Sequence, residues 1–590
     1  MRLWILFILL FSYSNFWGQS DVLAKEYFDK SQFDKAIIAY EELMKSNPNN
    51  YAHFNNLVAS YQALKQYDKS AKLIENFHKR TKQPNLYVDL GYNYQLQNDL
   101  PKAQEAYNKA IASLEQNVNY ASSIAYSFEQ KQLLEKALEV YQKAEAKNEN
   151  LNFDYQKGRI YGQLGDIDQM IASFLNYAYR VKNATVSIQN QLSYFMNEQN
   201  SELFVNSLRK ALLSRVQKSQ DIYWNEFLSW FFVQQKQYDR AFVQEKAIYK
   251  RESSDFFNIL NLAQLATNDK DFELAKQIYE FILENNSDIN VEIQVNTLLI
   301  QMRIDTATTK DYHIIQKELE AFLEKYGKNS NTIDLQLVQA RFMAFYLEKP
   351  QLSQQILLDL LSQNIHINKQ SEIKMNLADI YLYQEKFNQA LIYYSQVEHD
   401  MKNSEMGNQA NFKIAQTSYF KGDFPWALKQ LTVLKSTASQ LIANDALDLY
   451  LTINDVTIDS TNTALKELSG VDFMIYKKQT VQAKEKLFWM LEEFKNHQVE
   501  PIATYRLGQI LEEEGDYNKA LEYYLLLIEK FSESIFKDEA LYYAARIYQN
   551  KLDNKQKAKD LYERIIFEHQ DSIFYVEAQK EYRILRGDNI

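Results

Sequence analysis

Apolar residues recur along this chain at helical spacing, and the pattern itself repeats. The segments FDKAIIAYEEL, YDKSAKLIENF, LPKAQEAYNKA, LLEKALEVYQKA and IDQMIASFLNYA share one equivalent place, the anchor position, at separations of 34, 33, 34 and 33 residues. Two helices of three to four turns with two short connections take about 34 residues. The pattern therefore predicts tandem helical hairpins, each covering its apolar face with the next. The anchor residues are Ala36, Ser70, Ala103, Ala137 and Met170.

Aromatic residues keep the same register as the anchor residues. Four residues after the anchor, one turn further along the same helix face, stand Tyr40, Tyr107, Tyr141 and Phe174. A second aromatic recurs in the first helix of each unit, at Tyr27, Tyr61, Tyr94, Phe128 and Tyr161. A small anchor lets the two helices of a hairpin approach closely, so we expect these rings to be packed between helices.

This pattern resembles the tetratricopeptide repeat, and residues 90–110, LGYNYQLQNDLPKAQEAYNKA, match it best. Met170 departs from the small anchor residue of the family. The resemblance implies an all-α fold: an α-solenoid of tandem tetratricopeptide-like hairpins whose first helices line a concave groove.

The repeat continues with less regular spacing towards the C-terminus. Ala241 lies 71 residues after Met170, about two periods, so one degenerate hairpin is expected between them. Beyond about residue 290 the register blurs, and the polar, β-branched segments 306–311 and 454–464 predict loops. Further anchor residues are Ala275, Ala390, Ala427, Ala483, Ala520 and Ala558.

These spacings favour two stacks of hairpins. We expect an N-terminal solenoid over residues 20–289 and a C-terminal solenoid over 371–590, joined by an irregular helical connection over 290–370. Residues from about 480 to 585 are similar in style to the repeats of bacterial envelope proteins, although the proline of their tyrosine-proline-x-serine segment is missing here. That resemblance implies a place in the cell envelope and no specific activity.

Composition supports helices and excludes several kinds of site. The 590 residues include 12 glycines and 6 prolines, too few for the turns of a β-protein. Cysteine is absent, which excludes disulfides, thiolate metal sites and a lipidated N-terminal cysteine. The formal net charge is −11. Because nucleic-acid binding relies on a basic surface, no nucleic-acid partner is expected.

The first 19 residues have the order of a secretory signal. Arg2 precedes an apolar run over residues 3–11, and a polar end closes at Gln19. The apolar run is too short for a membrane span, and the ending at Gln resembles exported proteins of the Bacteroidetes group. We therefore expect residues 1–19 to be a signal peptide and the protein to be exported to the periplasm. Any association with a membrane, such as the outer membrane, would be made through partners or through an uncleaved signal segment.

No residues with catalytic, metal or cofactor chemistry stand out. The seven histidines show no i, i+4 pair that would place two metal ligands on one helix face. The pair Gly327-Lys328 lacks the other residues of a phosphate loop and predicts the C-terminus of a helix. We expect no metal, no cofactor and no enzyme activity.

In the tetratricopeptide family, one stripe of each first helix lines the concave groove. The stripe takes the places nine, six and two residues before the recurring aromatic and one after it. The resemblance implies a polar, mostly uncharged groove for a peptide or helix of another protein, because Asn and Gln offer both a donor and an acceptor. The residues at these places are Asn55, Gln62, Asn85, Tyr92, Gln95, Asn119, Tyr126 and Glu129.

The function we expect is a non-catalytic, periplasmic scaffold for protein–protein interactions in cell-envelope assembly or secretion. The alternative is a glycan-binding helical-repeat protein of the envelope. Proteins of that kind resemble lipoproteins with an N-terminal cysteine, which this chain lacks.

Overall fold

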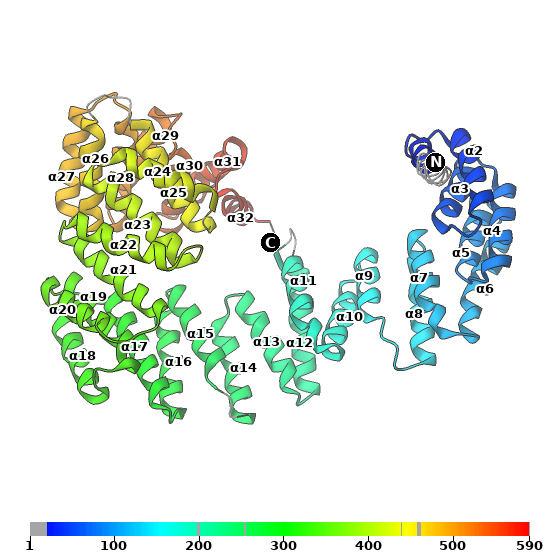
Figure 1. Ribbon diagram of the computed structural model, residues 1–590, viewed down its shortest axis with the longest axis horizontal. Coiled ribbons are helices and arrows are strands. Elements are labelled where there is room, and N and C mark those ends of the chain that lie inside the picture. Colours follow the sequence, from blue (N-terminus) through cyan, green and yellow to red (C-terminus); the bar gives the residue numbers. More distant parts are fainter. Residues whose placement is uncertain (1–19, 198–200, 253–254, 438, 457–461, 589–590) are drawn as a thin grey trace, which may run out of the picture. The chain divides into compact units, whose positions relative to one another are not determined.

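The computed structural model describes residues 20–588 apart from 198–200, 253–254, 438 and 457–461, and within those limits every regular element is a helix (Figure 1). The expected all-α fold of tandem hairpins is thereby confirmed. The expected signal segment, residues 1–19, lies outside the described residues. None of the helices in the described part is both long and apolar enough to cross a membrane.

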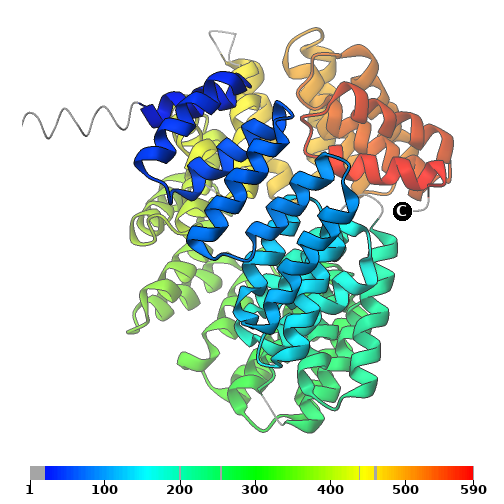
Figure 2. The same cartoon turned by 90° about the vertical axis from the view of Figure 1, so that its right-hand side faces the viewer.

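The chain divides into two compact units, Met1–Leu228 and Ser229–Ile590, and the division falls inside α13 (Ile222–Gln234). The domain limits expected from repeat regularity, at residues 289 and 371, stay a prediction. The first unit starts with a helix over residues 20–29, and its helices, blue to cyan in Figure 2, pack side by side as consecutive pairs. Its further elements are α2 (Phe33–Ser46), α3 (Tyr51–Ala63), α4 (Tyr67–Thr81), α5 (Leu86–Leu96), α6 (Leu100–Ala112), η1 (Ser113–Glu115), η2 (Val118–Tyr120), α7 (Ala121–Gln130), α8 (Leu134–Lys147), α9 (Asp154–Leu164), α10 (Ile167–Arg180), η3 (Lys182–Ala184), α11 (Thr185–Asn197) and α12 (Glu202–Lys218).

The second unit continues the same alternation of first and second helices. Its elements are α13 (Ile222–Gln234), α14 (Tyr238–Arg251), α15 (Phe257–Asn268), α16 (Phe272–Asn285), α17 (Ile289–Thr306), α18 (Tyr312–Tyr326), η4 (Ser330–Thr332), α19 (Ile333–Phe345), α20 (Pro350–Leu361), α21 (Ile367–Tyr383), α22 (Phe387–Asp400), α23 (Glu405–Lys421), α24 (Phe424–Thr437), α25 (Gln440–Val456), α26 (Thr463–Tyr476), α27 (Thr480–Glu493), α28 (Val499–Glu513), α29 (Tyr517–Lys530), α30 (Lys537–Asn550), α31 (Lys555–Glu568) and α32 (Tyr575–Arg586).

In three hairpins, the two helices touch where a glycine of the first helix faces an aromatic ring of the second. A Cβ atom added to Gly91 would stand 2.5 Å from the ring of Tyr107 and 3.0 Å from the backbone oxygen of Ala103. Such distances leave no room for a side chain, so glycine permits the close approach of α5 and α6. The same contact joins Gly158 to Phe174 at 2.8 Å and Gly508 to Tyr524 at 2.7 Å.

The anchor residues lie at this closest approach, as the repeat pattern predicts. Ala103 is 2% exposed, and even Met170, which departs from the small residue of the family, is buried in α10. The other anchor residues are also buried: Ala36, Ser70, Ala137, Ala241, Ala275, Ala390, Ala427, Ala483, Ala520 and Ala558. The sequence register is therefore confirmed along both units.

The stretches of blurred register are still helical hairpins. The pair α11–α12 fills the interval between Met170 and Ala241, where one degenerate hairpin is expected. The helices α17 to α20 cover the region of weakest pattern. There Ser353 of α20 is fully buried, 37 residues before Ala390, and its hydroxyl donates to the backbone oxygen of Ala340 at 2.7 Å. A hydroxyl that bonds the facing helix thus replaces the usual alanine.

An additional helix, α25, explains the long spacing between Ala427 and Ala483. The helix covers residues 454–456, where the sequence predicts a loop, so that part of the prediction is wrong. After it, α26 returns to pack against earlier helices: the ring of Phe473 lies 5.5 Å from that of Phe387 in α22 and 5.0 Å from that of Phe420 in α23. The Tyr419 hydroxyl also donates to Asp472 Oδ2 at 2.9 Å.

Carboxyl groups gather beside this region on α25, α26 and α30. Arg506 Nε donates to Asp472 Oδ1 at 3.0 Å. Glu539 is partly buried, and its Oε2 atom has no hydrogen-bond partner within the described structure. Burial, with the neighbouring Asp538 and the charge of Asp448, raises the pKa of Glu539 to about 9. Glu539 therefore keeps its proton at neutral pH in the folded protein.

The first prediction concerns the hairpin contact. We expect Ala103→Trp to destabilise the first unit, because an indole cannot fit between α5 and α6 and overpacking costs about 1–3 kcal/mol. The measurement is urea unfolding followed by circular dichroism, and Ala112→Trp at the exposed end of the same helix is the control. Equal midpoints for the two variants would contradict the packing argument.

The second prediction concerns Glu539. Its folded pKa lies above its unfolded value of 4.5, so the folded state binds more protons between these values and stability falls as pH rises from about 5 to 9. We expect Glu539→Gln to melt at the same temperature as wild type near pH 5 and at a higher temperature at pH 8. The exposed substitution Glu533→Gln is the control, and a constant difference across this pH range would refute the assignment.

Candidate functional site

Three successive first helices, α3, α5 and α7, line a groove of about 850 Å³ in the first unit. Because the hairpins repeat, equivalent places on these helices face the same side. Four of the residues that the sequence places in a concave groove are found together here. They are Asn55 and Gln62 on α3, Asn85 at the N-cap of α5 and Tyr126 on α7.

The other four residues of the expected set do not line this groove. The Tyr107 hydroxyl donates to Gln95 Oε1 at 2.8 Å, and the Tyr141 hydroxyl donates to Glu129 Oε1 at 3.1 Å. These two side chains therefore tie the ring of a second helix to the first helix of its own hairpin. Asn119 lies exposed in η2, and Tyr92 lies against a lysine described below. A role of these four in binding stays a prediction.

Tyr126 and Asn55 are exposed side chains of the groove. Tyr126 is 61% exposed although its ring is large and largely apolar, and Asn55 is also exposed. Gln62 lies half-buried, with Nε2 donating to Asn93 Oδ1 at 3.3 Å. An exposed tyrosine beside amide side chains offers apolar contact area and hydrogen bonds to the same bound segment.

The groove also contains an ion pair that the family pattern does not predict. Asp89 of α5 is 6% exposed, and its Oδ1 stands 3.2 Å from Nζ of Lys131, which follows α7. The same ammonium lies 5.3 Å from the centre of the Tyr92 ring. Burial raises the pKa of Asp89, and the charge of Lys131 opposes the rise. In the sequence, this pair is indicated by Asp89, a lone acidic residue inside a predicted first helix.

Tyr51 closes one side of the groove next to Asn85. Asn85 Nδ2 donates to the Tyr51 hydroxyl at 2.9 Å. Burial and the nearby charge of Asp89 raise the pKa of Tyr51 to about 12, so its hydroxyl stays protonated and available as a donor at neutral pH. The groove therefore presents neutral polar groups around the Asp89–Lys131 ion pair, and Lys82 is a further charged residue of its lining.

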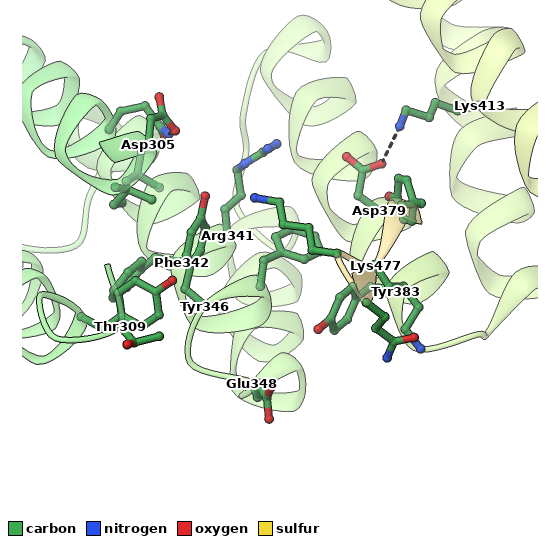
Figure 3. A pocket seen from close by; sticks show the side chains of 18 residues that line it. Asp305, Thr309, Arg341, Phe342, Tyr346, Glu348, Asp379, Tyr383, Lys413 and Lys477 are labelled. Atoms are coloured by element: carbon green, nitrogen blue, oxygen red, sulfur yellow. Dashed lines mark hydrogen bonds and ion pairs between the residues drawn. The ribbon is translucent and has the colours of Figure 1, made fainter. Parts of the chain in front are cut away.

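A second pocket, of about 580 Å³, lies within the second unit between α17, α19, α21 and α26. Figure 3 shows the ion pair between Lys413 and Asp379, 3.6 Å, on one side and Asp305 with Thr309 on the other. Asp379 also accepts a hydrogen bond from the Tyr394 hydroxyl at 2.6 Å. The central acidic group of this pocket is therefore held by groups of the chain itself.

Within the described residues, no three His, Asp or Glu side chains lie close enough together to hold a metal ion. The chemistry of the first-unit groove suits the binding of another molecule, because the groove combines donors, acceptors and the exposed ring of Tyr126 along three helices.

Sequence comparisons agree with this architecture. Models described as tetratricopeptide repeat match residues 22–50 and 155–177, residues 88–151, and residues 503–534 and 539–572. No curated protein sequence matches this one. The matched segments fall in both units and coincide with the most regular hairpins.

Two solved structures resemble the chain at low identity. One is titled "Structure of Naa15/Naa10 bound to HypK-THB", with 12% identity, 96% of this chain and 92% of that chain covered, and a TM-score of 0.26. The other is titled "Crystal structure of APC/C hetero-tetramer Cut9-Hcn1", with 14% identity, 92% and 98% covered, and a TM-score of 0.23. Because these TM-scores are low, the two structures carry no argument about this chain, and its assignment rests on the repeat matches. On its buried anchor residues, its glycine–ring contacts and the matched segments, the chain is a tetratricopeptide-repeat protein.

Proposed function

We propose that this protein is an exported, periplasmic scaffold in cell-envelope assembly or secretion, and that it holds a partner protein in the groove of the first unit. Tetratricopeptide repeats serve as protein–protein interaction modules, and scaffolds of this family are in general non-catalytic. The observation that carries the proposal is the gathering of Asn55, Gln62, Asn85 and Tyr126 in one groove.

The chemistry of the groove suits a polypeptide. A side-chain amide carries both an acceptor and donor hydrogens, which matches the alternating N–H and C=O groups of a peptide backbone. Asn55 on α3 is exposed in the groove, whereas Gln62 and Asn85 already donate to Asn93 and to the Tyr51 hydroxyl. Tyr126 supplies a large ring on the opposite side, on α7. Exposed tyrosines of this kind dominate the binding energy of many interfaces.

Export rests on the N-terminal sequence. Arg2, the apolar run over residues 3–11 and the polar end at Gln19 have the order of a signal peptide. The acidic charge of the chain is compatible with a periplasmic location.

The third prediction tests the groove. We expect Tyr126→Ala to weaken partner binding by about 2 kcal/mol, or about thirtyfold, because it removes an exposed hot-spot ring. The measurement is partner recovery by crosslinking and affinity purification from the native host, at matched protein levels. Tyr194→Ala is the control, since Tyr194 is 65% exposed on α11 outside the groove. Unchanged recovery with Tyr126→Ala would contradict the proposal, and binding to envelope polysaccharide in its place would favour the glycan-binding alternative.

The fourth prediction tests export. We expect the protein purified from its host to begin just after Gln19, since an apolar run followed by a polar end directs cleavage there. N-terminal sequencing of the periplasmic fraction measures this. A cytoplasmic chain that still starts at Met1 would refute the localisation and leave the groove proposal standing.

A further inference from the structure

The pocket between α17, α19, α21 and α26 exists because the second unit departs from simple stacking. In a regular solenoid each hairpin contacts only its neighbours. Here α26 returns to earlier helices, and its last residue, Tyr476, lines the same pocket as Phe342 of α19. The repeat pattern therefore does not account for this pocket. Its volume, about 580 Å³, is in the range of sites that bind small molecules.

Four basic residues line the pocket, and two of them have counter-ions within the fold. Lys413 Nζ stands 3.6 Å from Asp379 Oδ1, and Lys477 Nζ stands 2.9 Å from Glu385 Oε1. The Lys477 side chain is also only 14% exposed. The charges of these two ammonium groups are therefore compensated by the chain itself.

The other two basic residues, Arg341 and Lys478, form no ion pair with a carboxylate of the described residues. Arg341 Nη1 donates to Oδ1 of the neutral Asn376 side chain at 3.1 Å. A guanidinium carries five N–H groups, so this bond leaves donors for a ligand. Lys478 Nζ lies 5.4 Å from the centre of the Tyr346 ring. The pocket thus presents two cationic groups beside aromatic surface.

Tyr346 adds a neutral donor near these cations. Burial raises the pKa of Tyr346, the charge of Asp305 and the nearby Tyr312 add to the rise, and the charge of Arg341 opposes it. The Tyr346 hydroxyl therefore keeps its proton at neutral pH and can donate to an oxygen atom of a ligand. Figure 3 shows Arg341 and Tyr346 towards the middle of the pocket, with Asp305 and Glu348 at its edges.

We propose that this pocket binds a small organic anion whose carboxylate or phosphate group is held by Arg341, Lys478 and the Tyr346 hydroxyl. The inference is independent of the groove in the first unit. A planar guanidinium binds two oxygens of a carboxylate or phosphate through parallel hydrogen bonds. The rings of Phe345 and Tyr383, which also line the pocket, supply apolar contact area for the body of the ligand.

The acidic residues of the lining restrict where the ligand carries its charge. Asp305 and Glu348 are exposed, and neither forms an ion pair within the described part of the chain. They would repel a ligand with anionic groups along its whole length. We therefore expect a ligand with a single anionic group at one end and a neutral body.

The test is isothermal titration calorimetry of the full-length protein with three anions and their uncharged counterparts. The anions are benzoate, phenyl phosphate and glucuronate, and the counterparts are benzamide, phenol and glucose. We expect at least one anion to bind with a Kd below about 1 mM. Its counterpart should bind at least about tenfold more weakly, because charge-assisted hydrogen bonds are lost. Comparison of benzoate with phenyl phosphate identifies the preferred anionic group.

Arg341→Met removes the guanidinium from an exposed position and should weaken binding of that anion by at least about tenfold. Lys328→Met, an exposed lysine after α18 that does not line the pocket, is the control for loss of one positive charge. Asp305→Asn should leave binding unchanged or strengthen it, because it removes a nearby negative charge. Circular dichroism melting checks that each variant folds, and Lys478→Met replaces Arg341→Met if that variant unfolds.

Three outcomes would overturn the inference. In the first, none of the three anions binds. In the second, Arg341→Met or the uncharged counterpart binds as well as the original pair, which would show that the cations do not recognise the ligand. In the third, Asp305→Asn weakens binding, which would show that the pocket selects a cationic group. None of these outcomes bears on the groove of the first unit, so the proposed function is tested separately.

Discussion

The structure depends on the close approach of the two helices of each hairpin, and in three hairpins the ring of the second helix lies against a glycine of the first. Tyr107 on Gly91, Phe174 on Gly158 and Tyr524 on Gly508 repeat this contact in both units. It sets how closely two helices of a hairpin approach, and the small anchor residues on the second helix complete the fit. A hairpin so joined still exposes an apolar face, and this drives the next hairpin to pack beside it.

The groove is a consequence of that stacking. Successive first helices stand beside one another, so the places that do not face a second helix form a continuous surface. Some of these places are occupied by the fold itself, because the hydroxyls of Tyr107 and Tyr141 bond to Gln95 and Glu129. Of the remaining places, Asn55 and Tyr126 are exposed in the groove, whereas Gln62 and Asn85 bond to Asn93 and Tyr51.

The sequence predicts the hairpins well because the anchor residue and its aromatic partner report directly on packing. Half of the residues that it predicts for the groove line it, because a family stripe names positions and cannot say which way a hydroxyl such as that of Tyr107 will bond. It misses Asp89 and Lys131, since the pair depends on two helices meeting in space. It misses α25 too, because this helix carries no anchor residue to mark it.

The return of α26 to earlier helices has a mechanical consequence. A solenoid whose hairpins touch only their neighbours would unravel one hairpin after another when its ends are pulled apart. In the second unit, however, Phe473 packs on Phe387 and Phe420, and Tyr419 bonds to Asp472, so the chain between them is a closed loop. That loop bears no load until these contacts break. If the protein were stretched between two anchored partners, it would therefore lengthen in steps. This segment would extend after the hairpins next to it.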